Sequence, residues 1–131
     1  MKNKIIGITG ASGIIGSKLC ENLVENGYII NILTRNPNNF NKNPKIKIFK
    51  MDLLNPNKKR IQDFTKGITY LFHLASELLD ESKMMVTNYY STKILVDSIK
   101  NKNIIFIYLS SIGVFDFNKS NLINEDSYKK Q

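Results

Sequence analysis

The sequence predicts a doubly wound α/β fold, in which helices cover both faces of a parallel sheet. Short apolar segments alternate along the chain with segments of helical period, the order that parallel strands and their crossover helices require. Gly10, Gly13 and Gly16, spaced three residues apart, stand between the first apolar segment and the first helical one. Polar residues follow directly after several apolar segments, at what would be one common edge of the sheet. Right-handed crossovers then favour the strand order 3-2-1-4-5.

The strands are predicted from short apolar runs bounded by turn residues. We expect them at 4–9, 28–33, 46–51, 69–75 and 104–109. The runs are mostly apolar, which is typical of parallel strands covered on both faces. Between the second and third strands, two prolines and five asparagines in the segment 35–45 predict a loop.

Three helices are predicted from apolar residues at helical spacing. We expect them at 13–26, from Asn55 to just before Gly67 with Pro56 in the first turn, and at about 82–101. The first shows a four-residue period at Ile15, Leu19 and Leu23. The buried stripe of the third is expected at Val86, Tyr90, Ile94, Leu95 or Val96, and Ile99.

Length and composition predict one globular domain. The chain has 131 residues, of which 42% are hydrophobic and 23% charged, an ordinary balance for a protein with a core. No apolar run approaches 18 residues, and glycines interrupt the segment after the basic start, so we expect neither a membrane span nor a secretory signal. Cys20 is the only cysteine and is expected to be a small buried hydrophobe in a reducing, cytoplasmic setting.

The net charge of +8 raises the question of nucleic-acid binding. The lysines are scattered, apart from the run 58–60, and the chain has no basic helix and no zinc-finger spacing. We therefore expect a solvated basic surface and no nucleic-acid partner.

The glycine turn has the setting of a dinucleotide fingerprint, between a strand and a helix. Gly10 would permit the tight turn, Gly13 would let a pyrophosphate approach the backbone, and Gly16 would let the helix pack close to the sheet. The N–H groups of the first helical turn would face the phosphates. The residues predicted to bind the cofactor here are Gly10, Ser12, Gly13, Ile14, Ile15 and Gly16. The alternative is a glycine-rich turn that binds no ligand.

Five motifs at the strand ends and on the long helix together suggest a family. They read TGASGIIG, MDLLNP, FHLAS, TNYYSTKIL and YLSSIGVF. The chain resembles the amino-terminal part of an extended short-chain dehydrogenase/reductase, the group of NAD(P)-dependent sugar-nucleotide epimerases and dehydratases. The resemblance covers essentially the whole chain. It implies a Rossmann-type sheet truncated after strand 5, with an NAD(P)-binding domain at 1–115 and an irregular tail at 116–131.

The resemblance also implies roles for individual residues. Asp52 would accept a hydrogen bond from the adenine amino group, with Leu53 beside the ring. The segment Leu74-Ala75-Ser76 would run past the ribose and nicotinamide. Thr87 would approach the cofactor, Asn88 would brace the core, and Ser111 would be the active-site serine.

Each of these roles has a plainer alternative. Asp52 could cap a turn before Pro56, and Ser110-Ser111 could be an ordinary strand end. His73 lies inside a strand segment and is expected to be a packed histidine with a hydrogen bond. No second histidine and no cysteine cluster is present in the sequence, so no metal site is expected.

The end of the second strand bears on the choice of dinucleotide. NAD-specific relatives carry an acidic residue there, which binds the ribose 2′-hydroxyl. Here the stretch is Leu33-Thr34-Arg35-Asn36, which has an arginine and no carboxylate. A guanidinium suits a 2′-phosphate, so NADP is favoured, with NAD as the other possibility.

The catalytic end of the pattern is incomplete. In relatives, a tyrosine about two dozen residues after the serine exchanges the proton, and a lysine four residues later lowers its pKa. Tyr128 is the only tyrosine after Ser111, and a lysine four positions on would be residue 132. We therefore expect the Tyr-x-x-x-Lys segment and the substrate domain to lie outside this chain.

Two functional hypotheses follow. The chain is the cofactor half of an epimerase, dehydratase or reductase acting on a nucleotide sugar or similar carbonyl compound, inactive alone. Alternatively, it is a non-catalytic module that binds a dinucleotide or a partner. Either hypothesis leaves a sheet edge exposed, so a homodimer or a complementing carboxyl-terminal segment is an expected partner.

Overall fold

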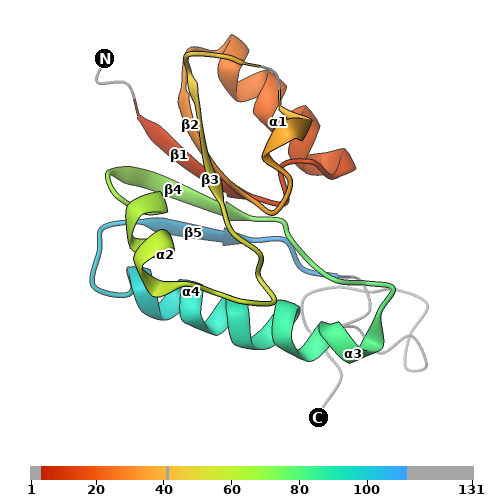
Figure 1. Cartoon of the computed structure of the whole chain (residues 1–131). Helices are drawn as coiled ribbons and strands as arrows, with labels where there is room; N and C mark the ends of the chain where they lie inside the picture. Colours follow the sequence, from red (N-terminus) through yellow and green to blue (C-terminus); the bar gives the residue numbers. More distant parts are fainter. Residues whose placement is uncertain (1–3, 41, 112–131) are drawn as a thin grey trace, which may run out of the picture.

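Five parallel strands form one sheet in a computed structural model that describes residues 4–40 and 42–111 (Figure 1). The strands are β1 (Ile5–Thr9), β2 (Ile29–Thr34), β3 (Ile46–Lys50), β4 (Ile68–His73) and β5 (Ile105–Tyr108). Their order is β3-β2-β1-β4-β5, and every neighbouring pair is parallel. The predicted fold class and strand order are confirmed.

Helices cover both faces of the sheet (Figure 1). Helix α1 (Ile14–Glu25) lies on one face, and α2 (Lys58–Phe64) lies on the other. A continuous helical segment follows β4 and comprises α3 (Glu81–Met84), η2 (Met85–Tyr90) and α4 (Ser91–Ile99), of which α4 packs beside α2. Of the helices described, none is both long and apolar enough to span a membrane.

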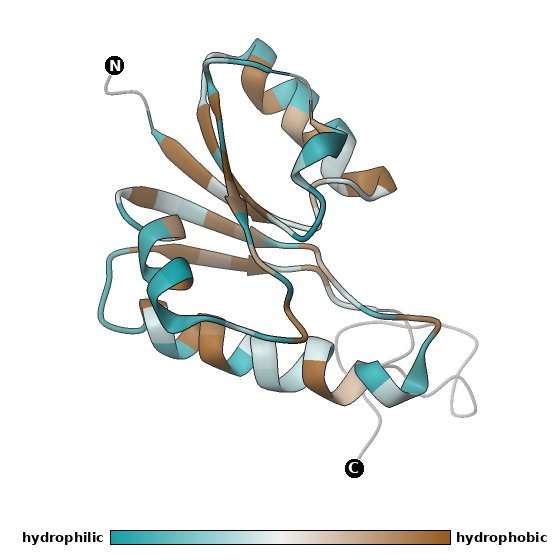
Figure 2. Cartoon of the chain, viewed as in Figure 1, coloured by the Kyte–Doolittle hydropathy of each residue, from teal (hydrophilic) through white to brown (hydrophobic). Residues whose placement is uncertain are grey.

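Two apolar clusters fill the space between these layers. The cluster on the α1 side consists of Ile6, Ile8, Ala11, Cys20, Ile30 and Ile32. The cluster on the α2 and α4 side consists of Leu33, Phe49, Met51, Ile61, Phe64, Ile68, Leu71, Leu95 and Ile99. The strands supply residues to both clusters, and Figure 2 shows them as largely hydrophobic ribbons.

The buried face of α1 differs from the prediction by one position. Ile15 is 56% exposed, whereas Gly16 and Cys20 are buried. A Cβ at position 16 would overlap the carbonyl oxygen of Gly10, so the helix touches the turn where it has no side chain. Leu19 and Leu23 are partly buried at the flank of this contact.

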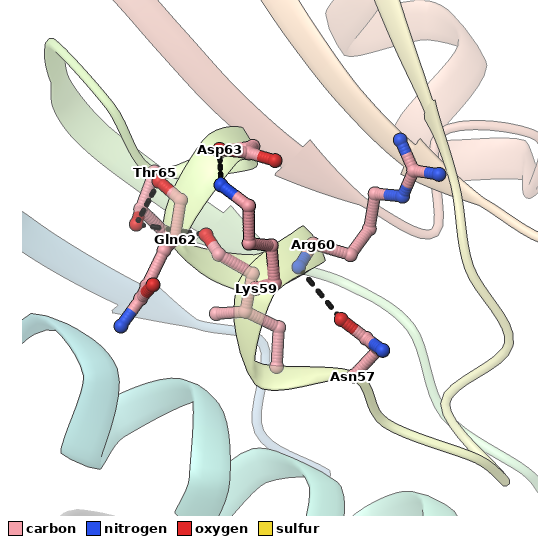
Figure 3. A network of polar contacts seen from close by, with 7 residues as sticks. Asn57, Lys59, Arg60, Gln62, Asp63 and Thr65 are labelled. Atoms are coloured by element: carbon pink, nitrogen blue, oxygen red, sulfur yellow. Dashed lines mark hydrogen bonds and ion pairs between the residues drawn. The ribbon is translucent and has the colours of Figure 1, made fainter.

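Helix α2 begins later than predicted. Its N-cap is Asn57, whose side-chain oxygen accepts a hydrogen bond from the Arg60 N–H at 2.9 Å (Figure 3). Pro56 therefore precedes the cap and does not lie in the first turn, because a strong capping side chain follows it. A second local difference is η1 (Pro37–Asn39), one short 3₁₀ turn within the predicted loop 35–45.

The long helix contains a π-helical stretch that the sequence pattern did not reveal. The buried residues of the long helix are Ser91, Leu95 and Ile99, all of which lie in α4. Tyr90 is 52% exposed, so its predicted place in the stripe was wrong, and of the two alternatives Leu95 and Val96 it is Leu95 that is buried. The periodicity of apolar residues missed Ser91, which is buried because its hydroxyl donates a hydrogen bond to the Leu53 carbonyl.

Candidate functional site

A cleft of about 310 Å³ opens at the carboxyl ends of the first four strands. It is lined by Gly10, Ser12, Gly13, Leu33, Thr34, Arg35, Met51, Asp52, Leu53, Leu74, Ala75, Ser76, Glu77 and Thr87. All but three of the residues predicted to bind a cofactor are among them. Five separate segments of the sequence thus meet at the topological switch point, where β1 lies between β2 and β4.

Four predicted residues do not line this cleft. Ile14, Ile15 and Gly16 form the first turn of α1 beside it, and the Ile14 side chain is 94% exposed. Ser111 follows β5, is exposed, and is not among the lining residues. The structure therefore brings the glycine turn and the exits of β2, β3 and β4 together, but not the predicted catalytic serine.

Four lining residues were not predicted: Leu33, Thr34, Met51 and Glu77. Three of them stand next to predicted ones at the ends of β2 and β3, so the argument from strand ends could have included them. Glu77 follows Ser76 directly, but its position depends on a contact with the long helix.

The three positions of the turn are glycine for different physical reasons. Gly10 has φ +72°, and a Cβ there would lie 2.6 Å from the Ala75 nitrogen of the β4 exit. Gly16 leaves room for the Gly10 carbonyl oxygen, which a Cβ at position 16 would overlap. Gly13 has φ −76°, and a Cβ there would meet a single atom, the Gly10 oxygen at 3.4 Å. The protein itself therefore leaves space at Gly13, as an approaching phosphate group requires.

The first turn of α1 is available to an anion. Gly13 is its N-cap, no side chain caps it, and no acidic residue lies in its first turn. Free N–H groups and the helix dipole both favour a phosphate at this position.

Opposite the glycine turn, β2 and β3 present one cation and one carboxylate. Arg35 is exposed at the end of β2, and no carboxylate accompanies it in the segment 33–36. Asp52 lines the cleft after β3, and its Oδ1 accepts the Leu54 N–H at 3.0 Å. Asp52 therefore caps a turn, as the alternative predicted, and lies in the cleft as well.

The third wall is a loop that the long helix holds in place. The Asn88 side chain accepts the Glu77 N–H at 2.7 Å and donates to the Glu77 carbonyl at 2.8 Å. The Glu77 carboxylate in turn accepts the N–H groups of Leu79 and Asp80, which hold its pKa below the usual range. Asn88 thus braces this loop, and through it the wall of the cleft.

The cleft offers little for proton transfer. None of its lining residues is a tyrosine, histidine, lysine or cysteine. Tyr89 and Lys93 do stand four residues apart, but Tyr89 packs edge-on against Tyr90, and Lys93 pairs with Asp97 at 3.5 Å. Tyr128 and the rest of 112–131 lie outside the described residues. Within 4–40 and 42–111, no group of three His, Cys, Asp or Glu side chains could hold a metal.

A larger groove of about 440 Å³ lies between α1 and the crossover that leads to β3. Cys20 lies in its wall, and burial raises the pKa of this thiol to about 11. A thiol with this pKa is protonated near neutrality and unreactive, which agrees with its place in the α1-side cluster. This groove has Ser12 in common with the cleft but contains none of the residues at the carboxyl ends of β2, β3 and β4, so the smaller cleft is the candidate site.

Comparisons with known proteins agree with this geometry. The uncharacterized protein y4nG of Sinorhizobium fredii is 28% identical over 92% of this chain and 31% of its own length. The epimerase Mth375 of Methanothermobacter thermautotrophicus superposes with a TM-score of 0.85 at 22% identity, over 98% of this chain and 42% of that one. MoeE5, solved with UDP-glucuronic acid and NAD, superposes with a TM-score of 0.80 at 23% identity, over 95% and 42%.

The chain also matches a protein family as a whole. The chain spans less than half the length of each of these three proteins. The sequence profile of the NAD dependent epimerase/dehydratase family matches residues 6–130, almost the whole chain. The chain therefore belongs to the NAD dependent epimerase/dehydratase family.

Proposed function

We propose that this chain forms the NAD(P)-binding part of an epimerase, dehydratase or reductase that acts on a nucleotide sugar or a similar carbonyl compound. The observation that carries the proposal is the open space at Gly13 beside the uncapped start of α1. With the dinucleotide bound in the cleft, its nicotinamide ring would accept or donate a hydride. The residues of this chain hold and orient the dinucleotide.

Each wall of the cleft suits one part of that ligand. Gly13 and the first N–H groups of α1 bind the pyrophosphate. Asp52, after β3, accepts a hydrogen bond from the adenine amino group, with Leu53 beside the ring. Ala75 and Ser76 border the ribose and nicotinamide, and Thr87 approaches them from η2.

We propose that the chain prefers NADP to NAD. Arg35 lies in the cleft at the end of β2, and the segment 33–36 has no carboxylate for a ribose hydroxyl. A guanidinium binds a phosphate by paired charged hydrogen bonds. MoeE5 was solved with NAD, so a preference for NADP would distinguish this chain from that protein.

The substrate and its partners belong to the same proposal. MoeE5 binds UDP-glucuronic acid, which supports a nucleotide sugar here. Ser111 would hydrogen-bond the substrate oxygen at the carbon that is oxidised or reduced. The single free cysteine, Cys20, agrees with a reducing, cytoplasmic location.

The exposed side chains of β5 and its exit suggest a protein partner as well. Ile105, Tyr108 and Leu109 are about half exposed at this edge of the described sheet. A complementing carboxyl-terminal segment or a second copy of the chain would cover them. The absence of Tyr, His, Lys and Cys from the cleft lining favours a second candidate function, a dinucleotide-binding module without catalysis.

The test is calorimetric titration of the wild type and Gly13→Val with NADP and NAD. Valine would occupy the space at Gly13, so binding should weaken at least about tenfold. Gly27→Asn is the matched control: it changes a glycine after the other end of α1, where no atom lies within 4 Å of a Cβ and asparagine tolerates the positive φ. A wild type that binds neither dinucleotide at millimolar concentration, or a Gly13→Val variant that binds equally well, would refute the site.

A further inference from the structure

His73 is a completely buried polar residue at the carboxyl end of β4, and it does not line the cleft. Both ring nitrogens have partners. Nδ1 lies 2.6 Å from the Thr9 hydroxyl, and Nε2 lies 2.8 Å from the Thr92 hydroxyl. Burial lowers the pKa of His73 to about 4, so the ring is neutral near neutrality. Burying an imidazole costs desolvation free energy, so a role for His73 is expected, and the positions of its two partners indicate that role.

One neutral tautomer of His73, with the ring proton on Nε2, fits these hydrogen bonds. The Thr9 hydroxyl oxygen accepts the Ala75 N–H at 3.3 Å, and its single proton is free to donate to Nδ1. Nε2 then carries the ring proton and donates it to Thr92. In this arrangement the Ala75 N–H, the Thr9 hydroxyl and the Nε2–H each donate to the next group in the chain of contacts.

These contacts connect α4 to two segments of the cleft, the glycine turn and the β4 exit. Thr9 directly precedes Gly10, and its carbonyl accepts the Leu74 N–H at 3.2 Å. The β4 exit lies so close to the turn that a Cβ on Gly10 would come within 2.6 Å of the Ala75 nitrogen. Thr92 stands in the first turn of α4, next to Ser91, whose hydroxyl donates to the carbonyl of Leu53 at the β3 exit.

The imidazole ring is also fixed from β5. It stacks on Tyr108 with ring centroids 5.5 Å apart, and the His73 carbonyl accepts the Leu109 N–H at 3.2 Å. His73 thus has contacts with β1, α4 and β5, and the residue after it lines the cleft.

We propose that His73 is a positioning residue for the dinucleotide, acting through Thr9 and Thr92. It fixes the glycine turn and the β4 exit against α4, and so sets the affinity of the cleft without touching the ligand. The inference rests on the proposed function, because it concerns the affinity of the same cleft.

The experiment removes the far end of this chain of contacts. Thr92→Val deletes the hydroxyl that holds Nε2, and Thr92→Ser restores it. Thr65→Val is the matched control, because Thr65 is also a buried threonine with a hydrogen-bonded hydroxyl. This hydroxyl donates to the Ile61 carbonyl and accepts from the Lys102 ammonium, before the amino-terminal ends of β4 and β5. Dissociation constants for NADP and NAD and melting temperatures are measured for all four proteins at a temperature where each is folded.

We expect Thr92→Val to bind the dinucleotides about threefold to tenfold more weakly, a change of the size that one hydrogen bond produces. Thr92→Ser should return to within about twofold of wild type, and Thr65→Val should lose stability without losing affinity. If Thr92→Val and Thr65→Val both lose only stability, the positioning role is refuted. A wild type that binds neither dinucleotide refutes the proposed function instead.

A second measurement needs no ligand. Amide hydrogen exchange at Gly13 and Ala75, both hydrogen-bonded in or to the turn, should be at least about fivefold faster in Thr92→Val than in Thr65→Val. Equal exchange in the two variants would refute the proposal even if Thr92→Val proved too unstable for titration.

Discussion

At the scale of single residues, Arg35 carries the predicted choice between the two dinucleotides. A charged, bidentate contact to a 2′-phosphate contributes about 1.5–3 kcal/mol, or roughly tenfold to a hundredfold in affinity. Arg35→Ala should therefore remove most of a preference for NADP and leave NAD affinity nearly unchanged. Arg60→Ala is the control, because it removes the only other arginine, which lies on α2 outside the cleft lining. A wild type that prefers NAD when both are titrated would contradict this role.

His73 makes stability depend on pH. Its pKa is about 4 in the folded protein and about 6.5 in the unfolded chain, so the unfolded chain binds more protons between these values. The contribution of His73 to stability is therefore fully present above the pKa of the unfolded chain and is lost as pH falls toward the pKa of the folded protein. Between pH 7 and pH 5 the loss should be about 2 kcal/mol, measured by urea unfolding.

The non-titrating variant His73→Gln provides the comparison. It should be less stable than wild type at pH 7, yet its stability should change less between pH 7 and pH 5. Parallel pH profiles for wild type and variant would show that His73 does not take up the proton.

At the scale of elements, the stability of α2 depends on its N-cap, Asn57, for which no capping role was predicted. Asn57→Ala removes the acceptor for the Arg60 N–H and should destabilise the protein by about 1 kcal/mol, while Asn57→Asp should retain most of the stability (Figure 3). The measurement is the midpoint of urea unfolding at constant m-value. An unchanged midpoint in Asn57→Ala would mean that solvent satisfies this N–H equally well.

The strands could be predicted because apolar runs bounded by Gly, Pro and Asn report burial on both faces directly. The faces of the helices could not be predicted as well. Gly16 contributes to the buried face of α1 by having no side chain, and Ser91 is buried because of a hydrogen bond to a distant carbonyl. Neither property follows from the periodicity of apolar residues, which placed Ile15 and Tyr90 inward.

At the scale of the whole molecule, the site was predictable because the topology of a parallel sheet brings strand ends together. Gly10, Arg35, Asp52 and Ala75 are far apart in sequence and line one cleft. Glu77 was missed because its place depends on Asn88, eleven residues away on a different element. Ser111 was predicted from family resemblance, and it is not among the residues that line the cleft.

The whole-molecule prediction is that a polypeptide of residues 1–131 does not transfer hydride at a useful rate by itself. Hydride transfer to a carbonyl also requires a proton, and among residues 4–40 and 42–111 no tyrosine, histidine or lysine lines the cleft. Its two carboxylates, Asp52 and Glu77, accept N–H groups of their own loops. A well-placed acid or base contributes about a hundredfold to ten-thousandfold, and substrate positioning contributes more.

The decisive assay follows NADPH oxidation with nucleotide-sugar and simple carbonyl substrates. It compares residues 1–131 with a version extended through any downstream Tyr-x-x-x-Lys, and only the extended version should turn over. Dinucleotide titration of both proteins is the control, because equal binding would place the difference in the chemical step or in substrate binding. Robust turnover by residues 1–131 that is lost in Ser111→Ala would contradict the prediction. It would place a proton donor near Ser111, and Tyr128 would be the first residue to replace, since no other tyrosine follows that serine.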